Sequence, residues 1–416
     1  MNSPASTAGF SETRKIQNPI IDQLFFAHTP EAVTFVNGVT TQAIKLQASD
    51  ILFEPEANEL RVRARIDGVL YEFGKVGLDS YLAISSRIKV LSGLDPTEKR
   101  KIQEGQYTIV IDGKTVNLRV EITQTINGEL IVVRIHEKET IVMELTSLGF
   151  NKISFDNYMQ ILKTRSGLIL VAGPTGCGKT TTLYSTVSKL NEGHNLNVMT
   201  IENPIEFQLE GVNQMQTQDD IGFTFASGLR TILRLTPDVV LVGEIRDKET
   251  AEIAVESGLT GQLVLSTLHA DDSVGALFRL LDLGIEPYFI NSSLVGIVAQ
   301  RLVRRVCQGC AEEYKPSAQE VEIFTKVVGR LPKRLVKGKG CPACQNLAYK
   351  GRLGIFEVLV MNASVRDLLR QKVNEDSFRK QLENAGFVNL LRDGLEKAES
   401  GLTTVEEVLA SNFRIL

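Results

Sequence analysis

The chain has 416 residues, of which 43% are hydrophobic and 23% are charged, and its formal net charge is −4. These values are typical of a soluble globular protein with two or three domains, and they exclude an overall basic footprint for nucleic acid. There is no apolar run of about 18 residues, so no membrane span is predicted, and the first residues lack the pattern of a secretory signal. We therefore expect a cytoplasmic protein that meets a membrane only through a partner or a surface patch.

The N-terminal third is expected to form a mobile leader over residues 1–29 and a domain over residues 30–140. The domain begins with helical periodicity that continues to Ile44. Strand-like runs follow, and a helix is expected over residues 80–91. Two pairs of strand-like runs are separated by Asp-Gly hairpin signals, at Asp67-Gly68 and Asp112-Gly113. This pattern predicts an α+β domain of mostly antiparallel strands.

A linker and a helix are expected over residues 141–166. Short apolar runs then alternate with helical stretches over residues 167–300, which predicts a parallel sheet with helices on both faces. Residues 301–350 are basic and contain cysteines, and residues 351–416 are expected to be helical.

The most specific motif is Gly173 to Thr180, which fits the phosphate-binding pattern G-x-x-x-x-G-K-[ST] between a buried strand and a helix start. Its glycines allow backbone N–H groups to surround phosphates. Lys179 is expected to reach the β- and γ-phosphates of ATP, and the Thr180 hydroxyl to bind Mg²⁺. The predicted nucleotide-binding residues are Gly173, Pro174, Thr175, Gly176, Cys177, Gly178, Lys179, Thr180 and Thr181.

Three further polar residues follow strand-like runs of the same region, namely Glu206, Glu244 and His269. Ligands of such sheets bind at the carboxyl ends of the strands, so we expect these side chains near the Mg²⁺ or the attacking water. A carboxylate there could orient or deprotonate that water. The alternatives are solvated acidic turns and a structural histidine.

The cysteines form two C-x-x-C pairs, Cys307 with Cys310 and Cys341 with Cys344. Four thiolates in two such pairs can close a tetrahedral Zn²⁺ site with no open position, so its role would be structural. Disulfides are not expected in a cytosolic protein. Four unliganded thiols, or a redox pair, are the alternatives.

Arginines recur in the N-terminal domain. Arg61, Arg63 and Arg65 alternate along one strand and therefore share a face, while Arg119 and Arg134 lie on later strands. The simpler interpretation is a solvated basic face. The second interpretation is that some of them neutralise γ-phosphate charge from another domain or subunit.

Together these motifs resemble the assembly and secretion ATPases of type IV pili and type II secretion systems, from about residue 30 to the C-terminus. Residues 202–206 look like the Asp box of that family, with Glu206 at its catalytic glutamate. Residues 243–247 look like its Walker B segment, and residues 260–270 like its His box. Arg119 and Arg134 match the arginines that face the nucleotide from the N-terminal domain.

The resemblance implies a RecA-like ATPase core, an N-terminal PAS-like domain and a small zinc-binding subdomain. It implies a homohexamer that binds ATP, Mg²⁺ and Zn²⁺, is peripheral at the inner membrane and binds no nucleic acid directly. Hydrolysis is then expected to turn a polytopic platform protein and add pilin subunits to a fibre. The retraction branch typically lacks the four cysteines, so we expect extension. The catalytic residues that it implies are Glu206, Glu244, His269, Arg119 and Arg134.

The sequence departs from the family pattern at three places. Leu52 replaces a histidine, Asn203 replaces the aspartate of the Asp box, and Leu235-Thr236 replaces Gln-Asp. These changes indicate a divergent branch and leave Glu202 and Glu206 to carry the Asp box. The type II secretion motor is the nearest competing function. Two more distant candidates are a RecA-like nucleic-acid translocase and a binding module with an inactive ATPase site.

Overall fold

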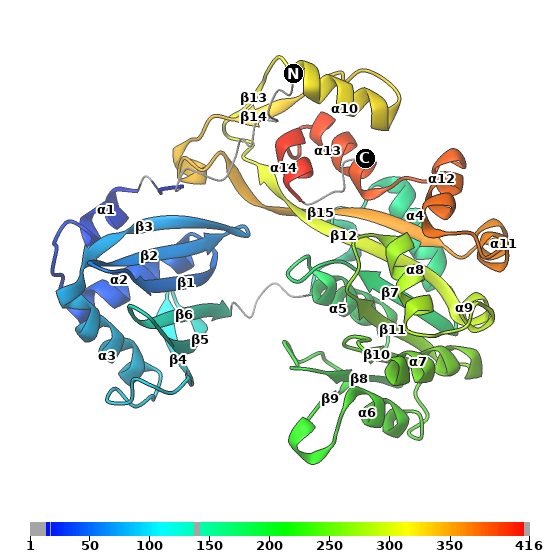
Figure 1. The fold of residues 1–416 in the computed structure, drawn as a ribbon, viewed down its shortest axis with the longest axis horizontal. Coiled ribbons are helices and arrows are strands. Elements are labelled where there is room, and N and C mark those ends of the chain that lie inside the picture. The colour runs from blue at the N-terminus through cyan, green and yellow to red at the C-terminus, as the bar shows by residue number, and fades with distance from the viewer. Residues whose placement is uncertain (1–13, 17, 137–141, 412–416) are drawn as a thin grey trace. The chain divides into compact units, whose positions relative to one another are not determined.

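The computed structural model describes residues 14–16, 18–136 and 142–411, and contacts divide the chain into two units (Figure 1). Two short segments from the C-terminal half of the chain pack with the N-terminal part. Unit 1 therefore comprises Met1–Glu139, Cys307–Cys310 and Gly338–Gly351, and unit 2 comprises Thr140–Val306, Ala311–Lys337 and Arg352–Leu416.

Unit 1 is built on a six-stranded antiparallel sheet in the order β3-β2-β1-β6-β5-β4. Asp67 and Asp112 have positive φ angles of 49° and 51°, as the two predicted Asp-Gly hairpins require. The prediction of a mostly antiparallel N-terminal sheet is confirmed. The strands are β1 (Ala48–Pro55), β2 (Glu59–Ile66), β3 (Val69–Gly77), β4 (Gln103–Ile111), β5 (Lys114–Thr125) and β6 (Gly128–His136).

Three helices cover the apolar face of this sheet: α1 (Pro19–Leu24), α2 (Ala32–Lys45) and α3 (Tyr81–Leu91). Helix α1 lies inside the segment expected to be a leader. The Asn18 side chain accepts hydrogen bonds from the N–H groups of Ile20 and Ile21, and the Ile21 side chain is fully buried. An N-cap and one buried anchor thus order a helix too short for periodicity to reveal. Residues 1–13 and 17 lie outside the described part of the leader.

The opposite face of the sheet is polar. Strand β2 alternates strictly, so Leu60 and Val62 enter the core while Arg61, Arg63 and Arg65 share the other face. These arginines do not form a basic patch, because acidic side chains of β1 and the turn after it neutralise them. Arg63 pairs with both carboxylate oxygens of Glu54, Arg61 lies 3.1 Å from Glu56, and Arg65 lies 3.4 Å from Asp50.

Unit 2 is built on a seven-stranded sheet in the order β15-β12-β7-β11-β10-β8-β9. The pairs from β12 to β9 are all parallel, which confirms the predicted parallel sheet. The strands are β7 (Gly167–Ala172), β8 (Val198–Glu202), β9 (Asn213–Gln216), β10 (Val239–Val242), β11 (Leu263–Leu268), β12 (Leu294–Val306) and β15 (Tyr349–Val360).

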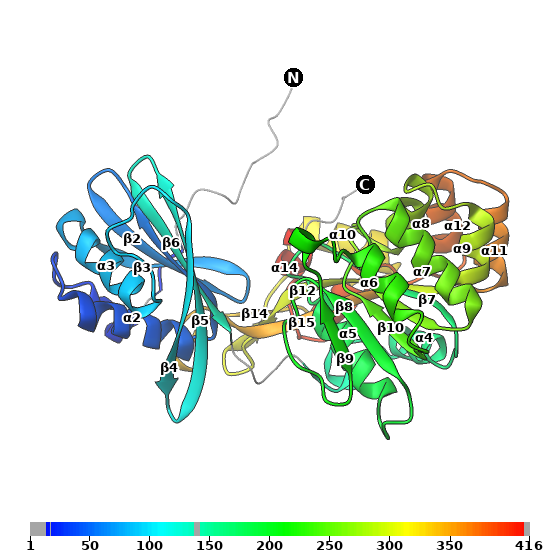
Figure 2. The ribbon, with the colours of Figure 1, turned by 90° about the horizontal axis from the view of Figure 1, so that it is seen from below.

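Helices cover both faces of this sheet (Figure 2). Leu168 and Leu170 of β7 pack with α6, α7 and α8, whereas Ile169 and Val171 pack with α4 and α5. Every residue of β7 is therefore buried, as in a strand at the centre of such a sheet. These helices and α9 are α4 (Lys152–Leu162), α5 (Lys179–Leu190), α6 (Phe225–Ile232), α7 (Lys248–Thr260), α8 (Ser273–Asp282) and α9 (Pro287–Ser293).

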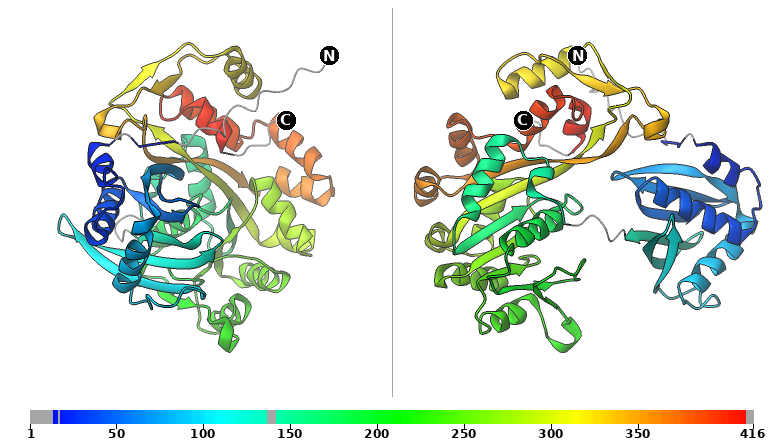
Figure 3. Two further views of the ribbon diagram at one scale, coloured as in Figure 1. Left: turned by 60° about the vertical axis from the view of Figure 1, so that its left-hand side comes forward. Right: turned by 180° about the vertical axis from the view of Figure 1, so that it is seen from behind.

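The C-terminal part adds more than the expected helices. Strand β15 extends the parallel core across a part of the chain predicted to be helical, and β12 runs through the basic segment before the first cysteine. Phe324 centres a small core shared by α10, α13 and α14 (yellow to red in Figure 3). The remaining elements are β13 (Ala311–Glu313), α10 (Ala318–Val328), β14 (Val336–Gly338), α11 (Ala363–Arg370), α12 (Glu375–Asn384), α13 (Leu390–Glu399) and α14 (Val405–Ala410).

The stability of unit 1 is expected to depend on a buried ion pair. Lys89 is 1% exposed and Glu129 is 4% exposed, and Lys89 Nζ donates to Glu129 Oε1 and to the carbonyl oxygen of Glu98. Glu129→Ala leaves the ammonium buried without its carboxylate, so we expect unit 1 to lose about 3 kcal/mol of stability. Denaturant-dependent hydrogen exchange of the β1 to β6 amides measures this loss.

The matched control is Lys45→Ala. Its ammonium lies 3.9 Å from Asp112 with both side chains at least half exposed, so the expected change is within about 0.5 kcal/mol. Equal losses of stability in Glu129→Ala and Lys45→Ala would contradict a special contribution of the buried Lys89–Glu129 ion pair.

Candidate active site and metal centre

The predicted phosphate-binding loop joins β7 to α5. Gly173, Gly176 and Gly178 have φ angles of +155°, +75° and +89°, which favour glycine. A Cβ atom at Gly173 would lie 2.4 Å from Cys177 Sγ and 2.7 Å from the carbonyl oxygen of Gln300. Lys179 Nζ donates to the carbonyl oxygens of Gly173 and Pro174, at 2.8 and 2.9 Å. The loop therefore combines the torsions and the close packing that a backbone phosphate cradle needs.

One residue that holds this loop was not predicted. Gln300 of β12 is 2% exposed, its Nε2 donates to the carbonyl oxygen of Cys177, and its Oε1 accepts from Thr182 Oγ1, both at 2.7 Å. It thereby fixes the loop to the adjacent strand. Its position in the sequence gives no sign of this role, which the parallel pairing of β12 with β7 reveals.

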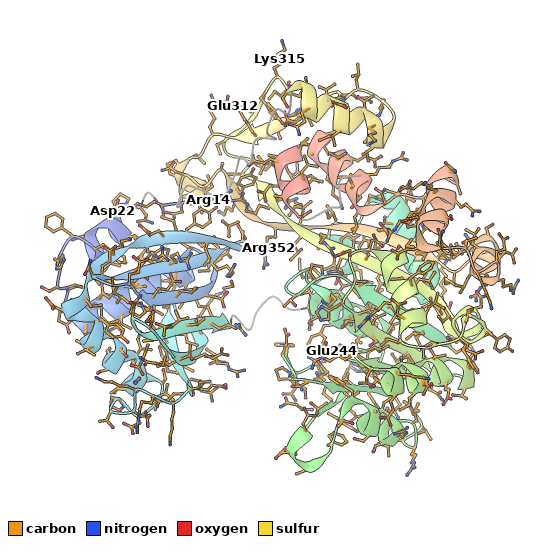
Figure 4. All side chains as sticks on the ribbon, viewed as in Figure 1. Arg14, Asp22, Glu244, Glu312, Lys315 and Arg352 are labelled. Carbon is orange, nitrogen blue, oxygen red and sulfur yellow. The ribbon has the colours of Figure 1, made fainter. Side chains whose placement is uncertain are left out.

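Two of the predicted catalytic residues meet at the carboxyl edge of the sheet. Glu244, which is labelled in Figure 4, follows β10, and His269 follows β11. The His269 Nε2 lies 3.6 Å from Glu244 Oε2. The Glu244 side chain is 14% exposed and also pairs with Arg246. The structure thus brings Glu244 and His269 together as expected.

The charges at this edge influence one another. Burial lowers the pKa of Lys179, and the Glu244 carboxylate partly opposes that change. Burial, followed by the positive charge of Lys179, lowers the pKa of His269. Lys179, Glu244 and His269 therefore form one electrostatic cluster, in which the histidine favours its neutral form.

The two glutamates of the expected Asp box differ in environment. Glu202, at the end of β8, is 4% exposed, and its carboxylate accepts hydrogen bonds from Tyr184, Thr200 and Gln214. Glu206 is exposed on the loop that follows. Glu202 is thus a buried carboxylate that accepts from three donors, whereas Glu206 is an exposed residue.

Arg119 and Arg134 lie in unit 1 as a cross-strand pair. They oppose each other in the β5–β6 register and therefore share the polar face of the sheet. Arg119 donates to Glu104 Oε2 at 2.9 Å, and Arg134 Nε donates to Asp50 Oδ1 at 3.3 Å. Their side chains remain 44% and 53% exposed. Their predicted role toward the nucleotide stays a prediction.

The four cysteines of the two C-x-x-C pairs form one cluster, with all sulfur atoms within 4.8 Å of one another. Sγ atoms lie 3.8 Å apart for Cys307 and Cys341, and 3.9 Å apart for Cys310 and Cys344. A tetrahedral site with Zn–S bonds of about 2.3 Å places its sulfur atoms about 3.8 Å apart. The donor set and the spacing therefore fit Zn²⁺, and Cys177 lies elsewhere, in the phosphate-binding loop.

The chain has a parallel sheet with helices on both faces, a phosphate-binding loop and a carboxylate, Glu244, at the carboxyl edge of the sheet. These features define it as a P-loop ATPase. Residues 28–410 match the family described as type II/IV secretion system protein, and the chain belongs to that family. It is accordingly an ATPase of secretion or pilus assembly machinery.

Relatives from both kinds of machinery match the chain. It is 42% identical to the type II secretion system ATPase E of Vibrio cholerae, over 91% of this chain and 74% of that protein. It is 39% identical to the type IV pilus assembly ATPase PilB of Myxococcus xanthus, over 96% of this chain and 71% of that protein.

Solved structures show the same fold. The ATPase DotB of Legionella pneumophila has a TM-score of 0.66 and 21% identity, covering 92% of this chain and 96% of that one. The pilus retraction motor PilT with bound ADP has a TM-score of 0.58 and 23% identity, covering 90% of this chain and 96% of that one. Within residues 14–16, 18–136 and 142–411, no helix has the length and apolar character needed to cross a membrane.

The metal centre makes a stoichiometric prediction. Elemental analysis of the purified chain should find about one Zn²⁺ per chain. Cys341→Ser removes one of four thiolates, so the bound zinc should fall well below that value. Cys177→Ser is the matched control and should retain zinc, because Cys177 lies outside the cluster. A wild-type content far below one zinc per chain would disprove the site.

Proposed function

We propose that the chain is the ATPase motor of type IV pilus assembly, working as a homohexamer on a polytopic platform protein of the inner membrane. The observation that carries the proposal is the nucleotide loop with Glu244 and His269 at one sheet edge, in a chain of the secretion ATPase family. The similarity to the type IV pilus assembly ATPase of Myxococcus xanthus, which covers 96% of this chain, supports a function in pilus assembly. On this proposal the protein is cytoplasmic and peripheral at the membrane, with a RecA-like core and a PAS-like N-terminal domain.

The residues divide the chemistry among themselves. Lys179 and the loop amides bind the phosphates of ATP, and Thr180 with Glu244 would hold Mg²⁺, which neutralises phosphate charge when bound. Glu206 orients or deprotonates the attacking water, for which its exposed carboxylate is suited. Neutral His269 can accept or donate a hydrogen bond beside Glu244.

Arg119 and Arg134 are proposed to stabilise the charge of the transferring phosphoryl group. Because they are cross-strand partners on one face, the two arginines can bind a single anion together. On ATP binding, phosphate oxygens would replace the Glu104 and Asp50 carboxylates as the hydrogen-bond acceptors of these arginines.

The second candidate is the type II secretion motor. It is favoured by the relatives of Vibrio cholerae and Pseudomonas aeruginosa, at 42% and 41% identity. The nucleotide-binding and catalytic residues proposed here serve both functions equally.

The catalytic assignment predicts two different kinetic losses. Glu206→Gln should abolish most turnover while ATP still binds, because only the reacting water loses its partner. Arg134→Ala should lower kcat by about 100-fold or more and change the Kd for ATP by less than about threefold. Steady-state hydrolysis and nucleotide titration measure these values.

The matched control is Lys101→Ala, an exposed cation of the same unit, which should leave both constants unchanged. Equal losses of affinity and turnover in Arg134→Ala would contradict a transition-state role.

Deletion of the gene in its own organism separates the two candidate functions. Loss of surface pili with normal exoprotein secretion supports pilus assembly, whereas retained pili with lost secretion supports the second candidate. ATPase assays with the cytoplasmic part of each platform protein supply a biochemical comparison, since the true partner should stimulate turnover. Strong stimulation by DNA instead would count against both.

A further inference from the structure

The segment that carries Glu206 is held by side chains from outside it. We refer to residues 203–209 as the Glu206 loop. Gln216 Oε1 accepts from the N–H of Ile205 at 3.0 Å. Gln214 accepts from the N–H of Leu209 at 2.7 Å and donates to the carbonyl oxygen of Phe207 at 3.0 Å. Both glutamines lie on β9, so this strand determines the course of the loop on one side.

On the other side the loop is bonded to the nucleotide-binding helix. Tyr184 lies on α5, five residues after Lys179, and it is 1% exposed. Its hydroxyl accepts from the backbone N–H of Glu206 at 3.4 Å and donates to Glu202. The residue that carries the exposed carboxylate is thus bonded through its own backbone to the helix that begins at the phosphate loop.

Glu202 fixes the orientation of this hydroxyl. Its carboxylate also accepts from Thr200 Oγ1 and from Gln214 Nε2, the latter at 3.1 Å. Burial, strengthened by the bond to Glu202, raises the pKa of Tyr184, so the phenol stays protonated and keeps donating. Its lone pairs are then directed to the N–H of Glu206.

We propose that Tyr184 is a positioning residue for ATP hydrolysis: through Glu202 and the N–H of Glu206 it links helix α5 to the Glu206 loop. Occupation of the phosphate loop is thereby transmitted to the placement of the Glu206 carboxylate. This inference rests on the proposed catalytic role of Glu206. A displacement of about 1 Å in a reacting group can cost about 100-fold in rate, so one hydroxyl can control turnover in this way.

The test compares two buried tyrosines, one on α5 and one on α4. Tyr184→Phe removes only the linking oxygen, and we expect kcat to fall about tenfold with less than a twofold change in KM. Tyr158→Phe is the matched control. Tyr158, on α4, is fully buried, and its hydroxyl is hydrogen-bonded to Thr186 Oγ1 of α5 rather than to Glu202. It should lose comparable stability and keep wild-type kcat.

Single-turnover hydrolysis of ATP by the full chain, with Mg²⁺, measures the chemical step even where release of product is slow. Glu202→Gln provides a second variant, because it weakens the same bond from its other end and should give the same split between kcat and KM. In the Glu206→Gln background, Tyr184→Phe should add no further loss, since the group that it positions is gone.

The outcomes separate the positioning role of Tyr184 from the catalytic role of Glu206. If Glu206→Gln is inactive while Tyr184→Phe and Glu202→Gln hydrolyse ATP like Tyr158→Phe, the link is overturned and the catalytic assignment stands. If Glu206→Gln hydrolyses ATP at the wild-type rate, the catalytic assignment itself is overturned, and the link with it.

Discussion

The parallel pairing of β7, β8, β10 and β11 is the constraint on which the proposed active site depends. Parallel strands place all their carboxyl ends at one edge of the sheet. Segments up to about a hundred residues apart in the chain therefore lie close together in space at that edge. The phosphate loop, the Glu206 loop, Glu244 and His269 each follow one of these strands. A slip of register in any pair would move one of these proposed catalytic groups away from the others.

Buried hydrogen bonding separates the tasks of the two neighbouring glutamates. A buried carboxylate must satisfy its oxygens within the protein, and Glu202 does so with three donors. The Glu202 carboxylate is thereby held inside the protein, with the residue only 4% exposed. Glu206 follows the strand into solvent, and its exposed side chain can meet water. The replacement of the expected aspartate by Asn203 falls between them, at an exposed position.

The sequence predicted what depends on local pattern, and it failed where contacts are distant. The phosphate loop, the Asp-Gly hairpins and the cysteine pairs have fixed spacings, so the residues alone reveal them. Helix α1 is too short for periodicity, and β15 is a largely buried strand without alternation. Gln300 and Tyr184 act through partners far away in the chain or on another element. Spacing in the sequence does not predict residues of that kind.

The tetracysteine segments have a consequence for how this protein can be divided. They belong to unit 1, where the Gln345 side chain accepts from Asn18 Nδ2 and the N–H of Gly351 donates to Asp67, both at 2.8 Å. The residues that complete unit 1 therefore lie about 170 to 210 positions after its N-terminal part in the sequence, at Cys307–Cys310 and Gly338–Gly351. An exchange of residues 1–139 alone would bring in a sheet without its matched cysteine segments. Unit 1 is therefore not a continuous stretch of sequence that could be exchanged by itself.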